Sequence, residues 1–234
     1  MGHFSFMDLL DKKHIVSLVG AGGKTTVMYQ LAEHFAKKGK KVLVTTTTHI
    51  WKPASNFAKS LAEVEALWQA GSYAVVGSIE VGTGKLTQLP KDVFENYCSL
   101  ADLVLIEADG AKGLPCKAPA KNEPVLLDVS DTVIAVMGLD ALHKSISEVC
   151  FRLEKVQEVL EVSSEHKLTE DDAVKLLLSK QGACKNVGQR EFYIVLNKCD
   201  DKDRLKCALK SGNLLEKEGF DIEKLWIRGE AFSE

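Results

Sequence analysis

Apolar residues along this chain form short continuous runs that alternate with stretches of helical spacing. A continuous apolar run bounded by turn residues is typical of a strand buried on both faces of a parallel sheet. Such runs lie at residues 15–19, 41–46, 102–106, 132–137 and 191–196. Helical spacing first follows residue 24, at Val27, Met28, Leu31, Ala32 and Phe35. The alternation predicts an α/β fold, a three-layer sandwich with a mostly parallel central sheet.

The weaker patterns predict a single domain over residues 1–234 that carries two additions. A hairpin and helix insert is expected near 72–100, where a glycine-containing turn at 82–85 separates two apolar stretches. A helical segment is expected near 145–185, and Thr169 is the expected cap of its second helix. The other predicted elements are an amphipathic lead at 1–13, helices at 57–70, 90–100, 151–162, 169–179 and 203–218, and strands at 73–79, 86–89 and 225–227.

The stretch 15–26 (IVSLVGAGGKTT) joins a predicted strand to a predicted helix through a glycine-rich turn. Glycines let backbone N–H groups approach phosphate oxygens closely, and a helix N-terminus adds a positive dipole end. Lys24 would reach the outer phosphates as a catalytic cation, and the Thr25 hydroxyl would ligate Mg²⁺. The predicted nucleotide-binding residues are Gly20, Ala21, Gly22, Gly23, Lys24, Thr25 and Thr26. This motif makes the predicted fold P-loop NTPase-like.

The motif departs from the usual P-loop pattern at one position. In G-x-x-x-x-G-K-[ST], the first glycine would fall at position 18, which is Leu18 in this chain. The loop is therefore expected to leave its strand differently and to wrap the β-phosphate in its own way. The alternative interpretation is a glycine-rich turn that binds no ligand.

The apolar run 102–106 delivers an acidic segment, Glu107-Ala108-Asp109-Gly110. Nucleotide-hydrolysing folds place the group that holds the Mg²⁺ water shell at the end of such a strand. Asp109 is the first choice for this metal and catalytic role, because Asp-Gly allows a turn there, and Glu107 is the alternative. A ligand-free Asp-Gly turn is also possible. The lysines that follow, Lys112, Lys117 and Lys121, either decorate a solvated loop or contact phosphate or an acidic substrate.

Two further strand ends carry candidate ligands. The run 41–46 continues into Thr47, Thr48 and His49, and hydroxyl groups beyond the carboxyl end of a parallel strand can meet a phosphate or a metal-bound water. Threonine also suits strands, so a structural role is the alternative for Thr47 and Thr48. His49 is more often a structural group.

The run 191–196 ends in Asn197-Lys198-Cys199-Asp200, an N-K-x-D sequence typical of guanine-nucleotide-binding domains. The Asp200 carboxylate would accept two N–H bonds from the guanine edge, the Asn197 amide would serve N7 and O6, and the Lys198 stem would cover the ring. Such a site would reject adenine, which lacks those donors. The alternative is a strand end followed by a helix cap, and the base stays open between guanine and adenine.

Composition narrows the functional classes. The net charge is −3 and no basic run stands out, so nucleic-acid and membrane partners are not expected. The six cysteines include no C-x-x-C pair, so the sequence predicts buried free thiols rather than a zinc or redox motif. No signal-peptide pattern and no bilayer-length apolar run occur, which fits a reduced, cytoplasmic protein.

Taken together, the motifs resemble the YqeC family, whose members are described as selenium-dependent molybdenum hydroxylase accessory proteins. The resemblance rests on VGAGGKTT (19–26), VTTTTHI (44–50), IEADGA (106–111) with KAP (117–119), VMGLDAL (136–142), LTEDDA (168–173) and VLNKCD (195–200). It implies a P-loop-type protein that binds GTP or ATP with Mg²⁺ and matures a selenium-containing molybdenum cofactor or its hydroxylase. Where the family usually has histidine before an arginine, this chain has Phe151 before Arg152.

Three functions fit these residues. The first is an NTPase whose hydrolysis times delivery to a molybdenum hydroxylase client. The second is a kinase or nucleotidyltransferase that uses the same phosphate cradle on a molybdopterin-type acceptor. The third is a non-enzymatic adaptor gated by nucleotide. No residue is plainly a general base, so the sequence does not choose among them.

Overall fold

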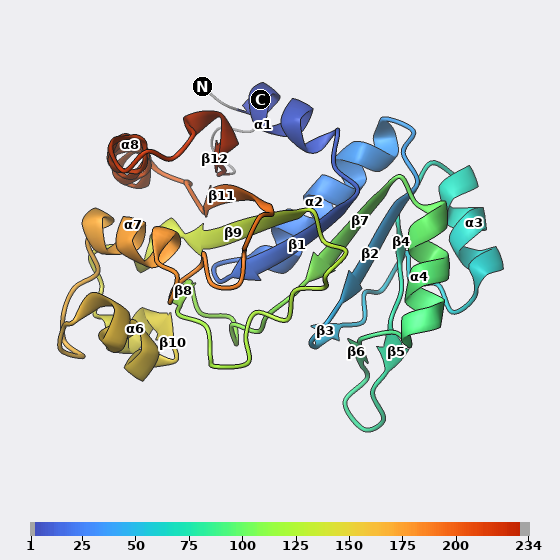
Figure 1. Ribbon diagram of the computed structural model, residues 1–234, viewed down its shortest axis with the longest axis horizontal. Coiled ribbons are helices and arrows are strands. Elements are labelled where there is room, and N and C mark those ends of the chain that lie inside the picture. The colour runs from blue at the N-terminus through green and yellow to red at the C-terminus, as the bar shows by residue number, and fades with distance from the viewer. Residues whose placement is uncertain (1–2, 230–234) are drawn as a thin grey trace.

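A computed structural model describes residues 3–229 of the chain. In the described part, seven strands form a central sheet in which all pairings are parallel. Across the sheet the strands are β12 (Leu225–Ile227), β11 (Glu191–Asn197), β9 (Thr132–Gly138), β1 (Ile15–Gly20), β7 (Leu103–Glu107), β2 (Val42–Thr46) and β4 (Ala74–Val75). The strand that precedes the glycine loop therefore lies in the middle, with the strand that ends in Glu107 beside it (Figure 1).

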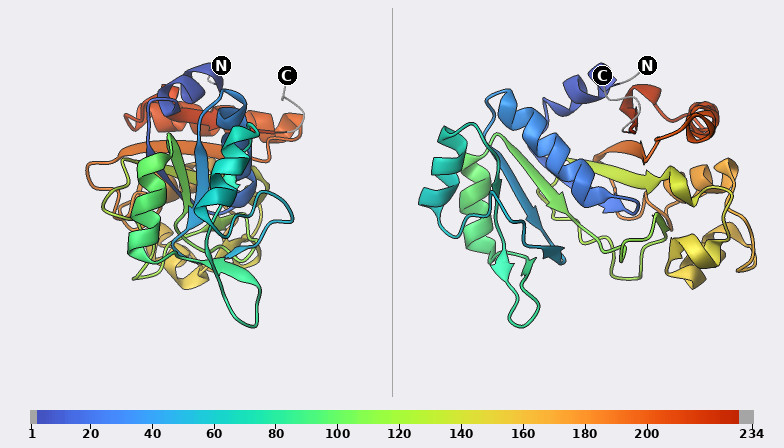
Figure 2. Two further views of the ribbon diagram at one scale, coloured as in Figure 1. Left: turned by 90° about the vertical axis from the view of Figure 1, so that its right-hand side faces the viewer. Right: turned by 180° about the vertical axis from the view of Figure 1, so that it is seen from behind.

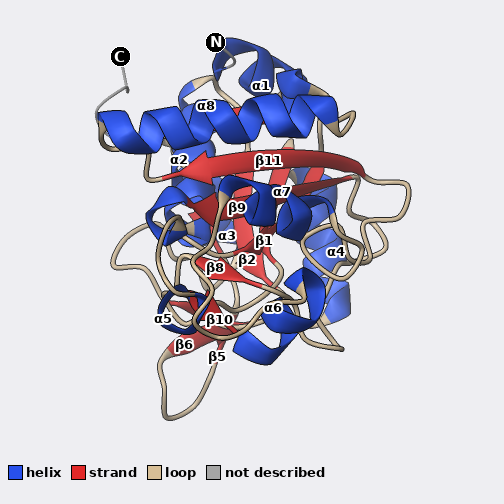
Figure 3. Ribbon diagram, turned by 90° about the vertical axis from the view of Figure 1, so that its left-hand side faces the viewer, coloured by secondary structure: helices blue, strands red, loops and turns tan. Residues whose placement is uncertain are grey.

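Helices cover both faces of this sheet, so the predicted three-layer α/β sandwich is confirmed. One face packs against α1 (His3–Leu10) and α2 (Lys24–Lys37), and Figure 2 shows α2 lying across it. The other face is covered in two parts. Helices α3 (Leu61–Gln69) and α4 (Lys91–Leu100) pack near β2 and β7, whereas α6 (Leu153–Leu160), α7 (Glu170–Leu178) and α8 (Lys202–Lys217) pack near β9 and β11. Figure 3 shows α7 and α8 beside β11.

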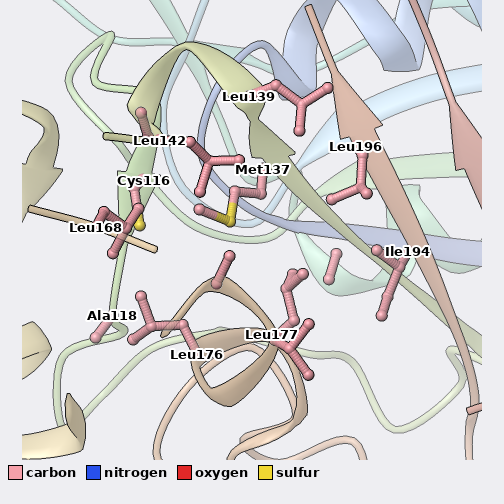
Figure 4. Packing of buried hydrophobic residues seen from close by; sticks show 14 of the residues in the cluster. Cys116, Ala118, Met137, Leu139, Leu142, Leu168, Leu176, Leu177, Ile194 and Leu196 are labelled. Carbon is pink, nitrogen blue, oxygen red and sulfur yellow. The ribbon is translucent and has the colours of Figure 1, made fainter. Parts of the chain in front are cut away.

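The helical segment is held to the sheet by apolar contacts. Leu176 and Leu177 of α7 belong to the same buried cluster as Met137 of β9 and Leu196 of β11 (Figure 4). Thr169 begins the helix with a capping box, because its hydroxyl accepts from the N–H of Asp172 and the Asp172 carboxylate accepts from the N–H of Thr169. The predicted cap is thus confirmed.

Several predicted elements are shorter than expected. The helix expected at 57–70 begins only at Leu61, because Ser60 caps it by accepting from the Glu63 N–H. The helix expected at 151–162 begins at Leu153, because β10 (Cys150–Phe151) pairs with β8 (Cys116–Lys117) instead. Residues 1–2 of the expected N-terminal lead lie outside the described residues.

The strand expected at 73–79 is two strands, so this prediction is wrong. β4 joins the central sheet, whereas β5 (Ser78–Ile79) pairs with β6 (Lys85–Thr87), which pairs with β3 (Ile50–Trp51). Gly77 lies at the break, where an added Cβ would sit 2.9 Å from the Leu86 side chain. The chain therefore turns at Gly77 into a small antiparallel sheet beside the carboxyl ends of the central strands.

The remaining described elements are short: η1 (Leu139–Ala141), α5 (Ile146–Val149) and η2 (Ile222–Lys224). Among residues 3–229, no helix is long and apolar enough to cross a membrane.

Candidate functional site

A cavity of about 760 Å³ opens at the carboxyl ends of β1, β7 and β2. Its wall contains residues 22–25 of the glycine loop, Glu107 at the end of β7, and residues 110–114 that follow. The rest of the lining includes residues 47–51, Lys85 of the small sheet, and the pair Phe151 and Arg152. Ligands of open parallel sheets bind beyond the carboxyl ends of the strands, so this cavity is the candidate site.

The glycine loop is held closely by the neighbouring strands. Gly22 has a φ of 77°, and an added Cβ would lie 2.1 Å from the backbone nitrogen of Gly138. Gly23 has a φ of 109° and precedes α2 in the left-handed conformation. A side chain at either position would have to displace the end of β9 or the Asn197 amide. The turn therefore directs the N-terminus of α2 toward the cavity, the arrangement that suits a bound anion.

Lys24 is the first residue of α2, and only 4% of it is exposed. Its Nζ donates to the carbonyl of Gly20 at 2.6 Å and lies 3.1 Å from Oδ1 of Asp109. Asp109 also accepts from the N–H of Gly20 at 3.0 Å. The predicted cation and the predicted acid thus form a buried pair that closes the loop on itself.

Asp109 is shared between two lysines. The Nζ of Lys117 lies 2.9 Å from Asp109 Oδ2, donates to the carbonyl of Gly110 at 2.7 Å, and pairs with Glu123 at 2.8 Å. Arg152 completes the chain of charges, since its guanidinium donates to both oxygens of Glu123, at 2.6 and 3.2 Å. Burial opposes ionisation of Glu123, but these donors outweigh it and hold the pKa of that carboxyl below its usual value.

Glu107 has a different environment from Asp109. Its carboxylate accepts from the Thr25 hydroxyl at 2.7 Å, and the residue is 7% exposed. Burial raises the pKa of Glu107 above its usual value, although Lys24 and the bond from Thr25 act in the opposite direction. No lysine or arginine within 4 Å of its oxygens is recorded among the described residues. Glu107 is therefore a buried carboxylate whose charge its neighbours offset only in part.

The threonines after β2 line the cavity but already hold protein groups. Thr47 donates its hydroxyl to the carbonyl of Val125 at 2.8 Å, and its N–H donates to the carbonyl of Glu107. The hydroxyls of Thr48 and Thr46 lie 3.3 Å apart. His49 is exposed and pairs with Glu80 at 3.1 Å. Thr47, Thr48 and His49 all line the cavity, and His49 directly precedes β3 of the small sheet.

The N-K-x-D segment reaches the glycine loop through Asn197 alone. Its amide donates to the carbonyl of Gly22 at 2.6 Å and accepts from Arg228 at 2.5 Å, so both ends are engaged. Lys198 pairs with Asp140 at 2.7 Å, and Asp200 lies 3.1 Å from Arg204. Lys198 and Asp200 are not among the described residues that line the cavity at the glycine loop. Asn197 thus holds the loop through Gly22, whereas Lys198 and Asp200 pair with other residues.

The structure brings together most residues singled out from sequence and adds others. Lys24, Thr25, Glu107 and Asp109 meet at one place, with Asn197 behind the loop. The sequence analysis missed Glu123, Lys85 and Trp51, and it left the role of Arg152 open. Glu123 could not be recognised, because it lies in an irregular loop with no pattern around it. Lys85 follows the turn of the predicted hairpin, but its place at the site depends on the pairing of this hairpin with β3, which was not predicted.

Comparison with known proteins gives one family. The family model described as "YqeC protein" matches residues 16–154 of this chain. The uncharacterised protein YqeC of Escherichia coli (strain K12) is 31% identical over 235 residues, covering 91% of this chain and 86% of that protein. A crystal structure of HypB from Helicobacter pylori in complex with nickel covers 92% of both chains at 14% identity, with a TM-score of 0.31. That TM-score is too low for the likeness to carry an argument about fold or function.

The buried ion network gives a stability prediction. Lys117→Met removes a cation that pairs with both Asp109 and Glu123, leaving buried carboxylates short of a partner. We expect a loss of about 3–5 kcal/mol in the free energy of unfolding. Urea denaturation of the variant and of Lys121→Met, an exposed lysine in the same loop, measures the difference. Equal, small losses in both variants would contradict the assigned role of Lys117.

Proposed function

We propose a function for this chain from the premise that it belongs to the YqeC family. The chain binds a purine nucleoside triphosphate with Mg²⁺ in the cavity at the glycine loop and hydrolyses it. It does so as an accessory protein in the maturation of a selenium-dependent molybdenum hydroxylase or of its cofactor. The observation that carries the nucleotide proposal is the meeting of Lys24, Thr25 and Glu107 at the N-terminus of α2, in one open cavity.

The proposed position of the phosphates follows from the charges at the start of α2. The first N–H groups of α2 have no partner within the helix, and the helix dipole favours an anion in front of them. Lys24 is held by a carbonyl and by Asp109, which has a second cation in Lys117. Lys24 can therefore turn to a phosphate oxygen while Asp109 keeps one lysine. Lys24 can thus move to a bound phosphate without leaving the buried Asp109 carboxylate unpaired.

The residues at this end fit Mg²⁺. Magnesium prefers oxygen ligands and binds through a few protein groups together with substrate phosphates. The Thr25 hydroxyl and the Glu107 carboxylate supply oxygens 2.7 Å apart, and among the described residues Glu107 forms no ion pair within 4 Å, although Lys24 acts on it from a longer distance. We therefore assign the metal role to Thr25 with Glu107, with Thr47 and Thr48 able to hold its water, and assign Asp109 to holding Lys24. Bound Mg²⁺ neutralises phosphate charge during transfer.

We assign the base to the N-K-x-D segment, with Asp200 as the acceptor for guanine N–H groups. Asn197 holds the loop to this segment, which puts the base site next to the phosphate site. Asp200 pairs with Arg204, and Lys198 pairs with Asp140. A bound base would share or replace these ion pairs. Because Asn197 is already bonded at both ends, Asp200 is left to supply the discrimination of GTP from ATP.

The selenium and molybdenum part of the proposal rests on the family resemblance. Binding and turnover of GTP and ATP by the pure protein, with and without a molybdopterin-type cofactor, tests it. Turnover that rises with the cofactor supports the accessory role. Absence of nucleotide binding under all conditions would contradict the whole proposal.

A second function, phosphoryl or nucleotidyl transfer to a small acceptor, is favoured by other residues that line the cavity. Lys85, Lys112 and Arg152 add positive charge to the lining, and Phe151 lies against Arg152 with the guanidinium carbon 4.6 Å from the ring centroid. Trp51 is 70% exposed at the rim. A planar, anionic acceptor in the cavity would find cationic side chains together with an aromatic surface. Product analysis in the same assay separates a phosphorylated acceptor from free phosphate.

We expect Lys24→Ala to reduce triphosphate affinity about ten- to 150-fold. The variant loses a charged hydrogen bond of about 1.5–3 kcal/mol, and the fold remains because Lys117 still neutralises Asp109. Isothermal titration with a non-hydrolysable triphosphate measures the affinity, and Lys121→Ala is the matched control. Unchanged affinity in Lys24→Ala would exclude the glycine loop as the phosphate site.

Variants of Glu107 and Asp109 distinguish the proposed roles of these two acids. Glu107→Gln should abolish the dependence of nucleotide affinity on Mg²⁺ without lowering the melting temperature. The folded pKa of Glu107 is raised, so its carboxylate costs stability as pH rises through that pKa, and the amide removes this cost. Asp109→Asn should instead lower the melting temperature, since two buried lysines lose their shared anion. A Mg²⁺ series that shows the reverse ranking would return the metal role to Asp109.

The base assignment is tested by Asp200→Asn. The variant has an amide, with one acceptor and one donor, in place of the Asp200 carboxylate, which accepts two hydrogen bonds. GTP affinity should therefore fall about ten- to 150-fold, while ATP affinity hardly changes. XTP has an oxygen in place of the guanine amino group and should gain relative to GTP. Competition binding with the three nucleotides measures this change. If the wild type prefers ATP, or the variant leaves all three affinities unaltered, the segment is a strand end and helix cap only.

A further inference from the structure

Three side chains of metal-binding type meet away from the phosphate cavity. His143 follows η1, Glu170 begins α7, and Cys207 lies in α8, so the three come from distant parts of the sequence. One donor atom from each lies within 4.8 Å of the others. None of the three lines the cavity described above. Imidazole, carboxylate and thiol together form a ligand set that suits a borderline-soft divalent ion.

The spacing of the donors matches that set. In a tetrahedral zinc site, bond lengths of about 2.0–2.3 Å put neighbouring nitrogen and sulfur ligands about 3.5 Å apart and nitrogen and oxygen ligands about 3.3 Å apart. Nε2 of His143 lies 3.5 Å from Sγ of Cys207 and 3.3 Å from Oε1 of Glu170. Two of the three donor pairs therefore already have the separation of ligands on one ion, and the third pair lies within 4.8 Å.

The backbone holds His143 in place at a conformational cost. His143 has a φ of 63°, in the left-handed region that non-glycine residues seldom occupy. Its N–H donates to the carbonyl of Leu168 at 2.7 Å, and Leu168 donates back to the carbonyl of Lys144 at 3.0 Å. These bonds tie His143 to the chain two residues before Glu170. Residues held in this way cluster at binding sites, where the surrounding structure fixes their conformation.

Glu170 is prepared to act as a ligand through one oxygen. The residue is 5% exposed, and its Oε2 accepts from Lys210 at 3.0 Å. Oε1, the oxygen that faces His143, remains for a metal ion. Lys210 thus orients the carboxylate in the manner of an outer-shell partner. A thiolate and a carboxylate would together neutralise a divalent ion.

We propose that His143, Glu170 and Cys207 form a binding site for a divalent transition-metal ion of the zinc type. Three protein ligands leave the fourth tetrahedral position for water. The His143 side chain is 59% exposed, so the site opens to solvent and its ion can exchange. Metal binding requires the thiolate and therefore releases the Cys207 proton. The ion would join the turn after η1 to the start of α7 and to the second turn of α8. This site stands independently of the proposed nucleotide function.

Cobalt spectroscopy and zinc competition test the site in the full chain, with its thiols kept reduced by a phosphine and Mg²⁺ in excess. A stoichiometric Co²⁺ complex should show a thiolate-to-metal charge-transfer band. Cys207→Ser should abolish the band, whereas Cys184→Ser, which alters a half-buried cysteine outside the cluster, should keep it. Competition with a chromophoric chelator should show that His143→Ala and Cys207→Ser each weaken Zn²⁺ binding at least about tenfold. Mutation of a residue that only hydrogen-bonds to a metal ligand already costs about this much, so loss of a ligand itself should cost no less.

Three outcomes would overturn the proposal: no charge-transfer band in the wild type, a band that persists in Cys207→Ser, or Zn²⁺ affinity unchanged in His143→Ala. Both test residues lie at or near the surface, so their variants should fold, and circular dichroism verifies this. Glu170→Gln, which also breaks the pair with Lys210, serves as a third variant for the same measurement.

Discussion

The pairing of Lys24 with Asp109 is the interaction on which the site depends. It joins the start of α2 to the segment after β7, and through the N–H of Gly20 it fixes the end of β1 as well. A lysine and an aspartate this deeply buried are stable only as partners, because either charge alone would be costly to desolvate. Lys117 gives Asp109 a second cation, so the pair with Lys24 can open without leaving the acid alone. The network is thus both rigid and able to release Lys24.

The same network connects the glycine loop to other parts of the cavity lining. Lys117 pairs with Glu123 as well as with Asp109, and Glu123 pairs in turn with Arg152. A ligand that draws Arg152 away from Glu123, or Lys24 away from Asp109, leaves that carboxylate with fewer cations. The change affects the other ion pairs of the network as well. Glu107 lies beside this network, with Thr25 as its bonded partner. Asp109 and Glu107 therefore differ in their partners, since Asp109 pairs with two lysines whereas Glu107 accepts from Thr25, and this difference underlies the metal role proposed for Glu107.

Sequence reasoning succeeds here where local pattern decides the structure. Continuous apolar runs locate the strands near 42–46, 103–107, 132–138 and 191–197, and Thr169 with Asp172 locates the start of α7. It fails at residues 73–79, where the close approach of Gly77 to Leu86 ends a strand that propensity alone would continue. The choice between Asp109 and Glu107 depends on which lysines reach them from residues 24 and 117. Such long-range contacts leave no periodic signal, and the metal-type cluster of His143, Glu170 and Cys207 is invisible for the same reason.

The most direct test of this account is a crystal structure with Mg²⁺ and a non-hydrolysable GTP analogue. The account predicts that Lys24 leaves Asp109 for the outer phosphates while Lys117 stays on Asp109, and that Mg²⁺ or its water contacts Thr25 and Glu107. A complex in which the phosphates lie elsewhere, or in which Lys24 stays on Asp109 and the metal binds that aspartate, would contradict it.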